Sequence, residues 1–241
     1  MASGRCTRCY AKRLRLSGGR GSPPRWEVNL EVGAFLGIFC KMYTIYRIGI
    51  KIPSIIIPNT YEVFANISEQ KLIDLLAFEY KKFWNNSRLK KAKNLGLTQS
   101  EICILASIVQ MEQQVKFDEH TKIAGLYINR LKRNMKLQAD PTVIYGITRG
   151  KYKLGRGLLL SELKKFSPWN TYKIDGLPPT PISNPGLASI KAATNPSKTD
   201  FLYFVSNGKG GHVFAKSYEK HLKNVTKWRK IEKQLKSTVE H

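Results

Sequence analysis

The sequence has few acidic residues, few cysteines and no long hydrophobic run. It holds 17 Asp and Glu residues against 41 Lys and Arg residues, which gives a formal net charge of +24 over 241 residues. The excess is not confined to a tail, because residues 61–241 alone hold 31 basic and 15 acidic residues. A field of this sign favours a polyanionic partner, and composition leaves nucleic acid, anionic lipid and an anionic cell-wall polymer open. A surface that is simply solvated by ammonium groups is equally compatible with it.

The sequence has four cysteines. They predict no disulfide framework, and their spacing matches at most one half of a metal site. Cys6 and Cys9 have the spacing of one half of a zinc site, but no second cysteine pair or suitably spaced histidine pair follows. Cys40 has no close cysteine partner in the sequence, and Cys103 lies in an apolar helical segment, where a small core residue is expected. We therefore expect no metal and no other cofactor.

The sequence also lacks a run long enough to cross a membrane. A transmembrane helix needs about 20 mostly apolar residues. The best stretch, Val32 to Cys40, is short and lies between Glu31 and Lys41. No signal peptide is indicated either, because the preceding basic stretch is too long and no small-residue cleavage site follows.

The chain divides into a basic N-terminal segment, residues 1–52, and an orderly region, residues 53–236. Residues 1–25 are rich in Arg, Gly and Ser and are expected to be disordered. Residues 26–52 are mixed apolar and basic, a pattern that leaves strands and an isolated helix open. The later region predicts an α+β fold, in which a helical half is followed by a small antiparallel sheet with long ordered loops. We predict helices at 68–84, 98–115, 119–133, 140–145, 189–193 and 217–236, and strands at 201–205 and 212–214 joined by a tight turn at 207–211.

One carboxylate breaks the apolar pattern of the second predicted helix. Leu105, Ile108 and Val109 form an apolar stripe, and Glu112 lies one turn further along it. An unpaired buried charge is costly, and desolvation raises the pKa of such a carboxyl, which suits a general acid. The alternative is that the stripe already reaches solvent at Glu112 and that a lysine pairs with it. The helix pattern alone does not decide between them.

A second group of polar residues lies downstream, with aromatic residues among them. Gln138, Asp140 and Thr142 surround the start of a short predicted helix, and Asn170, Thr171 and Tyr172 follow a Pro-Trp pair. Amides that bind hydroxyls and rings that stack on sugar faces suit a saccharide groove. Alternatively, Asp140 only caps a helix and Asn170 only shapes a turn.

Several motifs occur in the order found in a known family. Leu105 to Glu112 resembles the family signature LASIVEKE, Tyr127 to Leu131 resembles FINRL, and Leu137 to Gly146 resembles LQTDPTVIYG. Further matches follow at Asn170–Tyr172, Gly176–Pro179, Pro185–Gly186, Phe201–Val205 and Gly210–Phe214. Over roughly residues 53–230 the chain is therefore similar to the endolytic murein transglycosylases of the YceG-like, or MltG, family.

The resemblance implies cleavage of the MurNAc–GlcNAc bond inside peptidoglycan strands without water, which leaves 1,6-anhydro-MurNAc ends and limits strand length. One residue, Glu112, would act first as acid and then as base. The implied partners are glycan strands and cell-wall synthases rather than nucleic acid, at the extracytoplasmic face of the plasma membrane. The expected substrate-binding residues are Gln138, Asp140, Thr142, Tyr145, Asn170, Thr171, Tyr172 and His212.

The chain departs from the family pattern at three places. Gln110 replaces the first acid of EKE, so tuning of the neighbouring pKa by that acid is absent. Thr180 stands where many members have Gly, and a positive φ there would be strained. Members usually carry an N-terminal membrane anchor and a LysM-like domain, and residues 1–52 are too short for both. This predicts either a truncated chain or a beginning that is not native coding sequence, with Met42 as a conceivable internal start.

Two other functions stay open at this level. The first is a peptidoglycan-binding protein of the same family that has lost turnover. The second is a basic nucleic-acid-binding protein, suggested by the charge and by aromatic residues among the lysines, although no recognised RNA or DNA motif is present.

Overall fold

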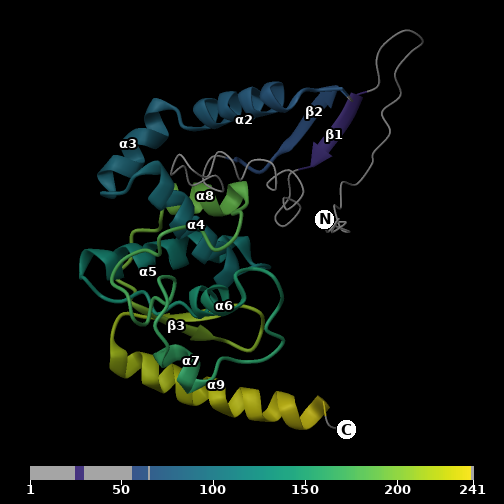
Figure 1. The fold of residues 1–241 in the computed structure, drawn as a ribbon. Coiled ribbons are helices and arrows are strands. Elements are labelled where there is room, and N and C mark those ends of the chain that lie inside the picture. Colours follow the sequence, from purple (N-terminus) through teal and green to yellow (C-terminus); the bar gives the residue numbers. More distant parts are fainter. Residues whose placement is uncertain (1–24, 30–55, 65, 240–241) are drawn as a thin grey trace.

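The computed structural model describes residues 25–29, 56–64 and 66–239 (Figure 1). The predictions for residues 1–24 and 30–52, including those for Cys6, Cys9 and Cys40, lie outside the described residues. The described elements, in chain order, are β1 (Arg25–Asn29), β2 (Thr60–Phe64), α2 (Glu69–Phe83), α3 (Asn86–Asn94), α4 (Gln99–Glu112), the 3-10 helix η3 (Phe117–Glu119), α5 (His120–Lys132), α6 (Asp140–Thr148), α7 (Leu160–Lys164), α8 (Leu187–Thr194), β3 (Tyr203–Ser206), β4 (His212–Ala215) and α9 (Tyr218–Val239). The α+β class is confirmed.

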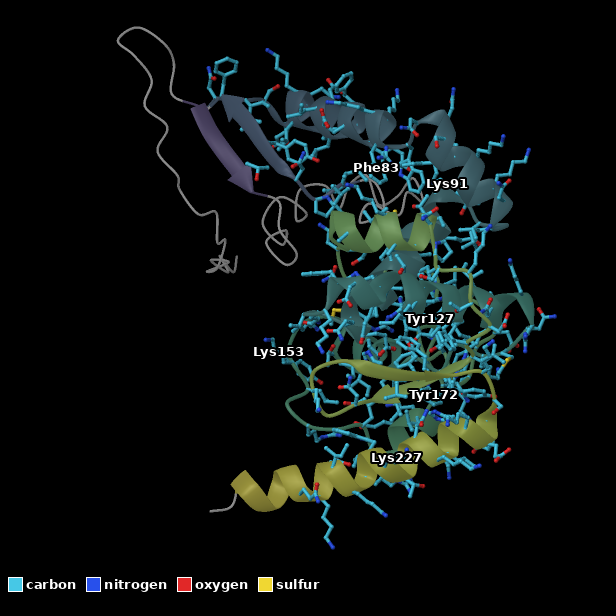
Figure 2. The ribbon with its side chains drawn as sticks, turned by 180° about the vertical axis from the view of Figure 1, so that it is seen from behind. Phe83, Lys91, Tyr127, Lys153, Tyr172 and Lys227 are labelled. Atoms are coloured by element: carbon cyan, nitrogen blue, oxygen red, sulfur yellow. The ribbon has the colours of Figure 1, made fainter. Side chains whose placement is uncertain are left out.

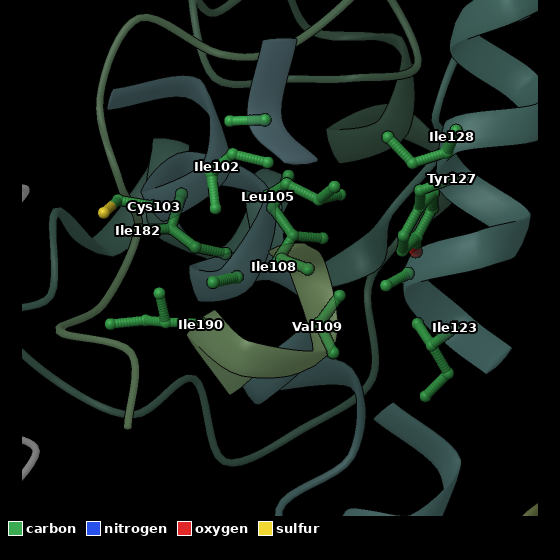
Figure 3. Close-up of a cluster of buried hydrophobic side chains, with 14 of the residues drawn as sticks. Ile102, Cys103, Leu105, Ile108, Val109, Ile123, Tyr127, Ile128, Ile182 and Ile190 are labelled. Carbon is green, nitrogen blue, oxygen red and sulfur yellow. The ribbon is translucent and has the colours of Figure 1, made fainter. Parts of the chain in front are cut away.

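Helix α4 forms the centre of the molecule. It packs against α5, α6 and α8, and its residues from Ile102 to Val109 are all buried (Figure 3). The helix is therefore buried all round over these residues, with Ser107 as the one polar side chain among them, and the prediction of a single apolar stripe was too narrow. The prediction that Cys103 is a core residue is confirmed, because its exposed fraction is 1%.

Local side-chain chemistry fixes both ends of α4. A capping box begins the helix, and its Thr-x-x-Glu pattern is visible in the sequence: Thr98 Oγ1 accepts a hydrogen bond from the Glu101 N–H at 3.2 Å, and Glu101 Oε2 accepts one from the Thr98 N–H at 2.8 Å. The helix ends at Glu112 rather than at Val115. The Gln113 side-chain carbonyl oxygen accepts from the N–H groups of Val115 and Lys116, so it satisfies donors that a continuing helix would have bound to its own backbone.

The helices that follow agree with the predictions to within a few residues, with one correction. We predicted Asp140 as the N-cap of α6, but Ala139 occupies that position and no side chain caps the helix. The Asp140 carboxylate accepts a hydrogen bond from the Tyr172 hydroxyl instead. The partner is 32 residues away in the sequence, so the local pattern could not show it.

Two short helices were not predicted. The Asn85 side chain caps α3, yet Ala92 is the helix's only buried residue, so the helix has no apolar stripe to detect. In α7, Glu162 accepts from the Leu159 N–H at the helix start, and no residue of this helix is buried.

The described strands form two antiparallel pairs. In the predicted C-terminal hairpin, Phe204 lies opposite Phe214 and Ser206 opposite His212, and α9 packs along it (Figure 1). The second pair joins β1 to β2. A strand was one of the two alternatives for residues 26–52, but its pairing with β2, and the inclusion of Arg25 in it, were not predicted. This pairing crosses the expected division at residue 52, which stays a prediction.

No helix in the described part of the chain is long and apolar enough to cross a membrane. Within the same residues, no cluster of three or more His, Cys, Asp or Glu side chains is arranged to hold a metal ion.

Candidate active site

Glu112 is the last residue of α4, and its carboxyl group lies against α5. The Tyr127 hydroxyl of α5 donates a hydrogen bond of 2.6 Å to Glu112 Oε1. Desolvation raises the pKa of Glu112 to about 7, and the nearby Asp140 carboxylate adds to this, while Tyr127 and Arg130 oppose it. Within the described residues, no ion pair joins Glu112 to a Lys or Arg, so the structure does not show the alternative lysine partner.

Tyr127 and Arg130 lie one turn apart on α5 and support the carboxyl group. Tyr127 is fully buried, and desolvation together with Glu112 raises its pKa well above the usual value, so it stays a hydrogen-bond donor. The Arg130 guanidinium donates to the carbonyl oxygens of Leu202 at 2.7 Å and Leu137 at 2.8 Å. Arg130 therefore ties α5 to the segments that precede α6 and β3, and its charge stays close to Glu112.

Glu112 lines a pocket of about 250 Å³. Figure 2 shows Tyr127 and Tyr172 in the part of the molecule between α8 and α9 where the pocket lies. The lining residues are Glu112, Tyr127, Arg130, Leu137, Gln138, Asp140, Tyr172, Tyr203, Phe204, Tyr218 and His221.

Three of the expected binding residues, Gln138, Asp140 and Tyr172, line the same pocket as Glu112. The Tyr172 hydroxyl donates to Asp140 Oδ1 at 2.6 Å, so these two side chains form one polar surface. Gln138 has φ 49°, a left-handed conformation that is uncommon for residues other than glycine and concentrates at functional sites. The exposed Gln138 side chain therefore extends from a backbone in an unfavourable conformation at the pocket wall.

Three other expected residues, Thr142, Asn170 and Thr171, are buried and do not line the pocket. Thr171 Oγ1 accepts from the Ala139 N–H at 2.9 Å and lies 2.8 Å from Thr142 Oγ1. Asn170 Nδ2 donates to the backbone carbonyls of Leu163 and Lys165 at the C-terminal end of α7, and its Oδ1 accepts from the Tyr172 N–H at 2.9 Å. These residues hold the loops that present the polar surface to the pocket.

Tyr145 and His212 also lie outside the pocket lining. The Tyr145 ring packs on Trp169, with 5.8 Å between ring centroids. His212 binds Glu119, which accepts from the His212 N–H at 3.0 Å and contacts its Nδ1 at 2.8 Å. Although desolvation opposes it, these bonds and one from Gln113 lower the pKa of Glu119.

Gln110 and Thr180, the two residues in the described part of the chain that depart from the family pattern, each form hydrogen bonds of their own. Gln110 Oε1 accepts from the Ser189 hydroxyl at 2.5 Å and from the Gly186 N–H at 3.3 Å, so this side chain holds the start of α8 rather than Glu112. Thr180 does not have a positive φ, and its hydroxyl oxygen accepts from Trp169 Nε1 at 2.9 Å. No strain arises at Thr180.

Sequence reasoning did not select seven of the lining residues. Tyr127 and Arg130 lie within a quoted motif, and their spacing of three along a helix, next to Glu112, was the available signal. Leu137 also lies within a quoted motif. Tyr203 and Phe204 lie within the quoted match Phe201–Val205, whereas Tyr218 and His221 lie outside every quoted match. Nothing local indicated that these four residues approach Glu112, because that approach depends on how β3 and α9 pack.

A larger pocket of about 470 Å³ lies beside the loop between α3 and α4. Its one carboxyl group belongs to Glu101, which the capping box already engages. We therefore take the smaller pocket as the candidate site.

Comparisons with known proteins identify the family of this chain. The model of the YceG-like family matches residues 29–227. A Bacillus subtilis (strain 168) protein named endolytic murein transglycosylase is 42% identical over 142 residues, which are 59% of this chain and 37% of that protein. A Streptococcus pneumoniae (strain D39) protein of the same name is 35% identical over 175 residues, 70% of this chain and 30% of that protein. The chain thus spans about a third of the length of these curated relatives.

A solved structure shares the fold. The crystal structure of a YceG-like protein from Listeria monocytogenes aligns with a TM-score of 0.59 and 29% sequence identity, and the alignment covers 78% of this chain and 63% of that one.

Proposed function

Because this chain belongs to the YceG-like family, we propose that it is a peptidoglycan lytic transglycosylase in which Glu112 is the acid and the base. The observation that carries the proposal is a desolvated carboxyl group with a pKa of about 7 in the wall of a pocket. Near neutral pH, both its protonated and its ionised forms are populated. A single group that first gives and then takes a proton needs both forms. The names of the curated relatives support the same reaction.

The proposed reaction consumes no water. Protonated Glu112 gives its proton to the glycosidic oxygen as the bond from that oxygen to C1 of MurNAc breaks. The resulting carboxylate takes the proton of the C6 hydroxyl of the same MurNAc, and O6 bonds to C1. The products are a 1,6-anhydro-MurNAc end and a free GlcNAc hydroxyl, and Glu112 is again protonated.

Asp140 supports a second candidate, a hydrolytic glycosidase. It provides another carboxyl group in the wall of the same pocket, and hydrolases use two such groups flanking the bond that they cut. Against a role as base or nucleophile, Asp140 Oδ1 already accepts the Tyr172 hydroxyl. The two reactions leave different ends, because hydrolysis gives reducing sugars and transglycosylation gives anhydro sugars.

The deciding experiment is mass spectrometry of purified sacculi after digestion. We expect wild-type protein to release anhydro-muropeptides and Glu112→Gln to bind sacculi without releasing them. The matched control is Asp74→Asn, which changes an exposed carboxyl group on α2 and keeps activity. Reducing ends alone would establish hydrolysis, and full activity of Glu112→Gln would remove Glu112 from the mechanism.

The two other functions left open by the sequence, glycan binding without turnover and nucleic-acid binding, can be tested with the same purified protein. Wild-type protein that binds sacculi and cleaves nothing would be a binding protein without turnover. A salt-sensitive shift of random oligonucleotides without glycan cleavage would indicate the nucleic-acid function.

The proposed function also predicts where the protein acts and which proteins lie near it. A transglycosylase of nascent strands would act at the extracytoplasmic face of the plasma membrane, near cell-wall synthases, and would limit strand length. Association with the membrane is expected from the family resemblance.

A further inference from the structure

One part of the pocket wall consists of aromatic rings from β3 and α9. The Tyr203 ring stacks on His221, with centroids 5.2 Å apart and planes 22° apart, and lies 5.8 Å from the Tyr218 ring. The Arg130 guanidinium lies 5.4 Å from the centroid of the Tyr203 ring. We call Tyr203, Tyr218 and His221 the aromatic wall. The three rings contact one another, and the wall begins beside Arg130, whose charge lies close to Glu112.

The aromatic wall is open to a ligand at its outer end. Tyr218 is 60% exposed, although it lines the pocket. An exposed tyrosine is ordinary by itself. Here its ring extends a pocket wall whose inner members are half-buried, so a run of contacting aromatic rings leads from solvent into the pocket that Glu112 lines.

His221 adds polar capacity that the protein does not use. Its Nδ1 atom is buried and has no hydrogen-bond partner within the described residues. Burial and the nearby Arg130 charge lower the pKa of His221, so the ring is neutral at pH 7 and offers one donor and one acceptor. Buried polar atoms without partners are uncommon in proteins.

We propose that the aromatic wall is a subsite for an N-acetylhexosamine ring of the glycan strand, separate from the polar surface formed by Gln138, Asp140 and Tyr172. The inference rests on the proposed function. A bond cut at Glu112 has a sugar on each side, so a second sugar-binding surface is needed beside the polar surface. The apolar face of a pyranose fits against the rings, and its hydroxyl or acetamido groups can bind the imidazole of His221.

The test measures binding in a Glu112→Gln background, which prevents turnover. The probe is purified, uncross-linked GlcNAc–MurNAc strands without stem peptides, titrated by calorimetry into the full chain. We expect Tyr218→Ala to weaken binding by about tenfold, as for loss of one favourable aromatic contact, and Tyr218→Phe to stay within roughly twofold of the parent. Tyr152→Ala removes an equally exposed tyrosine (58%) outside the pocket and should bind like the parent.

His221→Phe keeps a ring and removes both nitrogens. Loss of an unsatisfied buried nitrogen should leave the unfolding midpoint unchanged or higher. Strand binding should nevertheless weaken several-fold. A His221 with only a structural role would shift the midpoint and leave the affinity unchanged, and that result would overturn its place in the subsite.

Cleavage by wild-type protein, assayed in parallel, separates the two claims. If wild type releases anhydro products while Tyr218→Ala and His221→Phe bind like the parent, the subsite is overturned and the proposed function stands. If wild type releases no cleavage products, the proposed function fails. Weaker strand binding by Tyr218→Ala would still support the subsite in that case.

Discussion

The Tyr127 hydroxyl and the Glu112 carboxyl group form a 2.6 Å hydrogen bond across the packing of α4 against α5. Because Tyr127 is fully buried, the bond fixes the direction of a carboxyl group at a helix end, where side chains otherwise have rotamer freedom. The bond also stabilises the ionised form of Glu112 and so partly offsets desolvation. The position and the pKa of the Glu112 carboxyl group therefore both depend on the buried hydroxyl of Tyr127.

Tyr127→Phe tests this relationship. Without the donor, the pKa of Glu112 rises above about 7. The acid form then persists to higher pH, so the alkaline limb of the kcat/KM profile moves upward. The variant also loses the bond that fixes the direction of the Glu112 carboxyl group. A hydrogen bond to a charged group contributes about 1.5–3 kcal/mol, so we expect kcat/KM at pH 7 to fall by roughly tenfold to a hundredfold.

Tyr80→Phe is the matched control, because it removes a half-buried hydroxyl on α2, outside the pocket. It should keep the wild-type profile. A Tyr127→Phe profile that coincides with that of wild type would show that the bond does not tune Glu112.

Glu112→Gln should change how stability depends on pH. The folded-state pKa of Glu112 is raised from 4.5 to about 7, so its contribution to stability is present below pH 4.5 and is lost as pH rises through 7. Relative to wild type, Glu112→Gln should therefore gain about 3 kcal/mol of unfolding free energy between pH 4.5 and pH 8.5. Urea unfolding at both pH values measures this. Parallel stability curves for the two proteins would contradict the desolvation of Glu112.

Glu119→Gln should show the opposite dependence. The pKa of Glu119 is lowered by hydrogen bonds from His212 and Gln113, so its contribution is present above pH 4.5 and is lost as pH falls below it. At pH 7 we expect a loss of roughly 1.5–3 kcal/mol, typical of hydrogen bonds to a charged group, and a smaller loss at pH 3.5. Asp118→Asn, which changes the exposed neighbouring carboxyl group, is the control. An equal loss at both pH values would mean that the Glu119 charge is not involved.

Gly125→Ala should destabilise the packing of α5 on the loop after α8. A Cβ atom at this position would collide with the backbone carbonyl oxygen of Ser197, and that backbone is held by a hydrogen bond from the Ser197 N–H to the Thr121 carbonyl oxygen. We expect a loss of about 1–3 kcal/mol in denaturant unfolding, as for overpacked sites. Gly157→Ala is the control, because a Cβ there meets nothing within 4 Å. Equal stability of the two variants would show that α5 can move away at no cost.

Elements whose signals lie within a few residues could be predicted from the sequence. The capping box of Thr98 and Glu101 acts over three residues, and the Gly-rich turn between β3 and β4 over five. The position of Glu112 at the end of an apolar helix was visible in the same way. The end of α4 was not, because the Gln113 side chain that stops it is itself held by the Gly210 carbonyl oxygen, 97 residues away.

The sequence by itself determined the order of the helices other than α3 and α7 and singled out Glu112, because periodicity and capping are local properties of the chain. Only the tertiary structure decided what surrounds that carboxyl group. Tyr127 lies 15 residues from Glu112, and Tyr172 lies 32 from Asp140, yet hydrogen bonds join each pair. Desolvation depends on how α4, α5, β3 and α9 pack, and no local pattern contains that packing. The altered proton affinity of Glu112 is therefore a property of the fold.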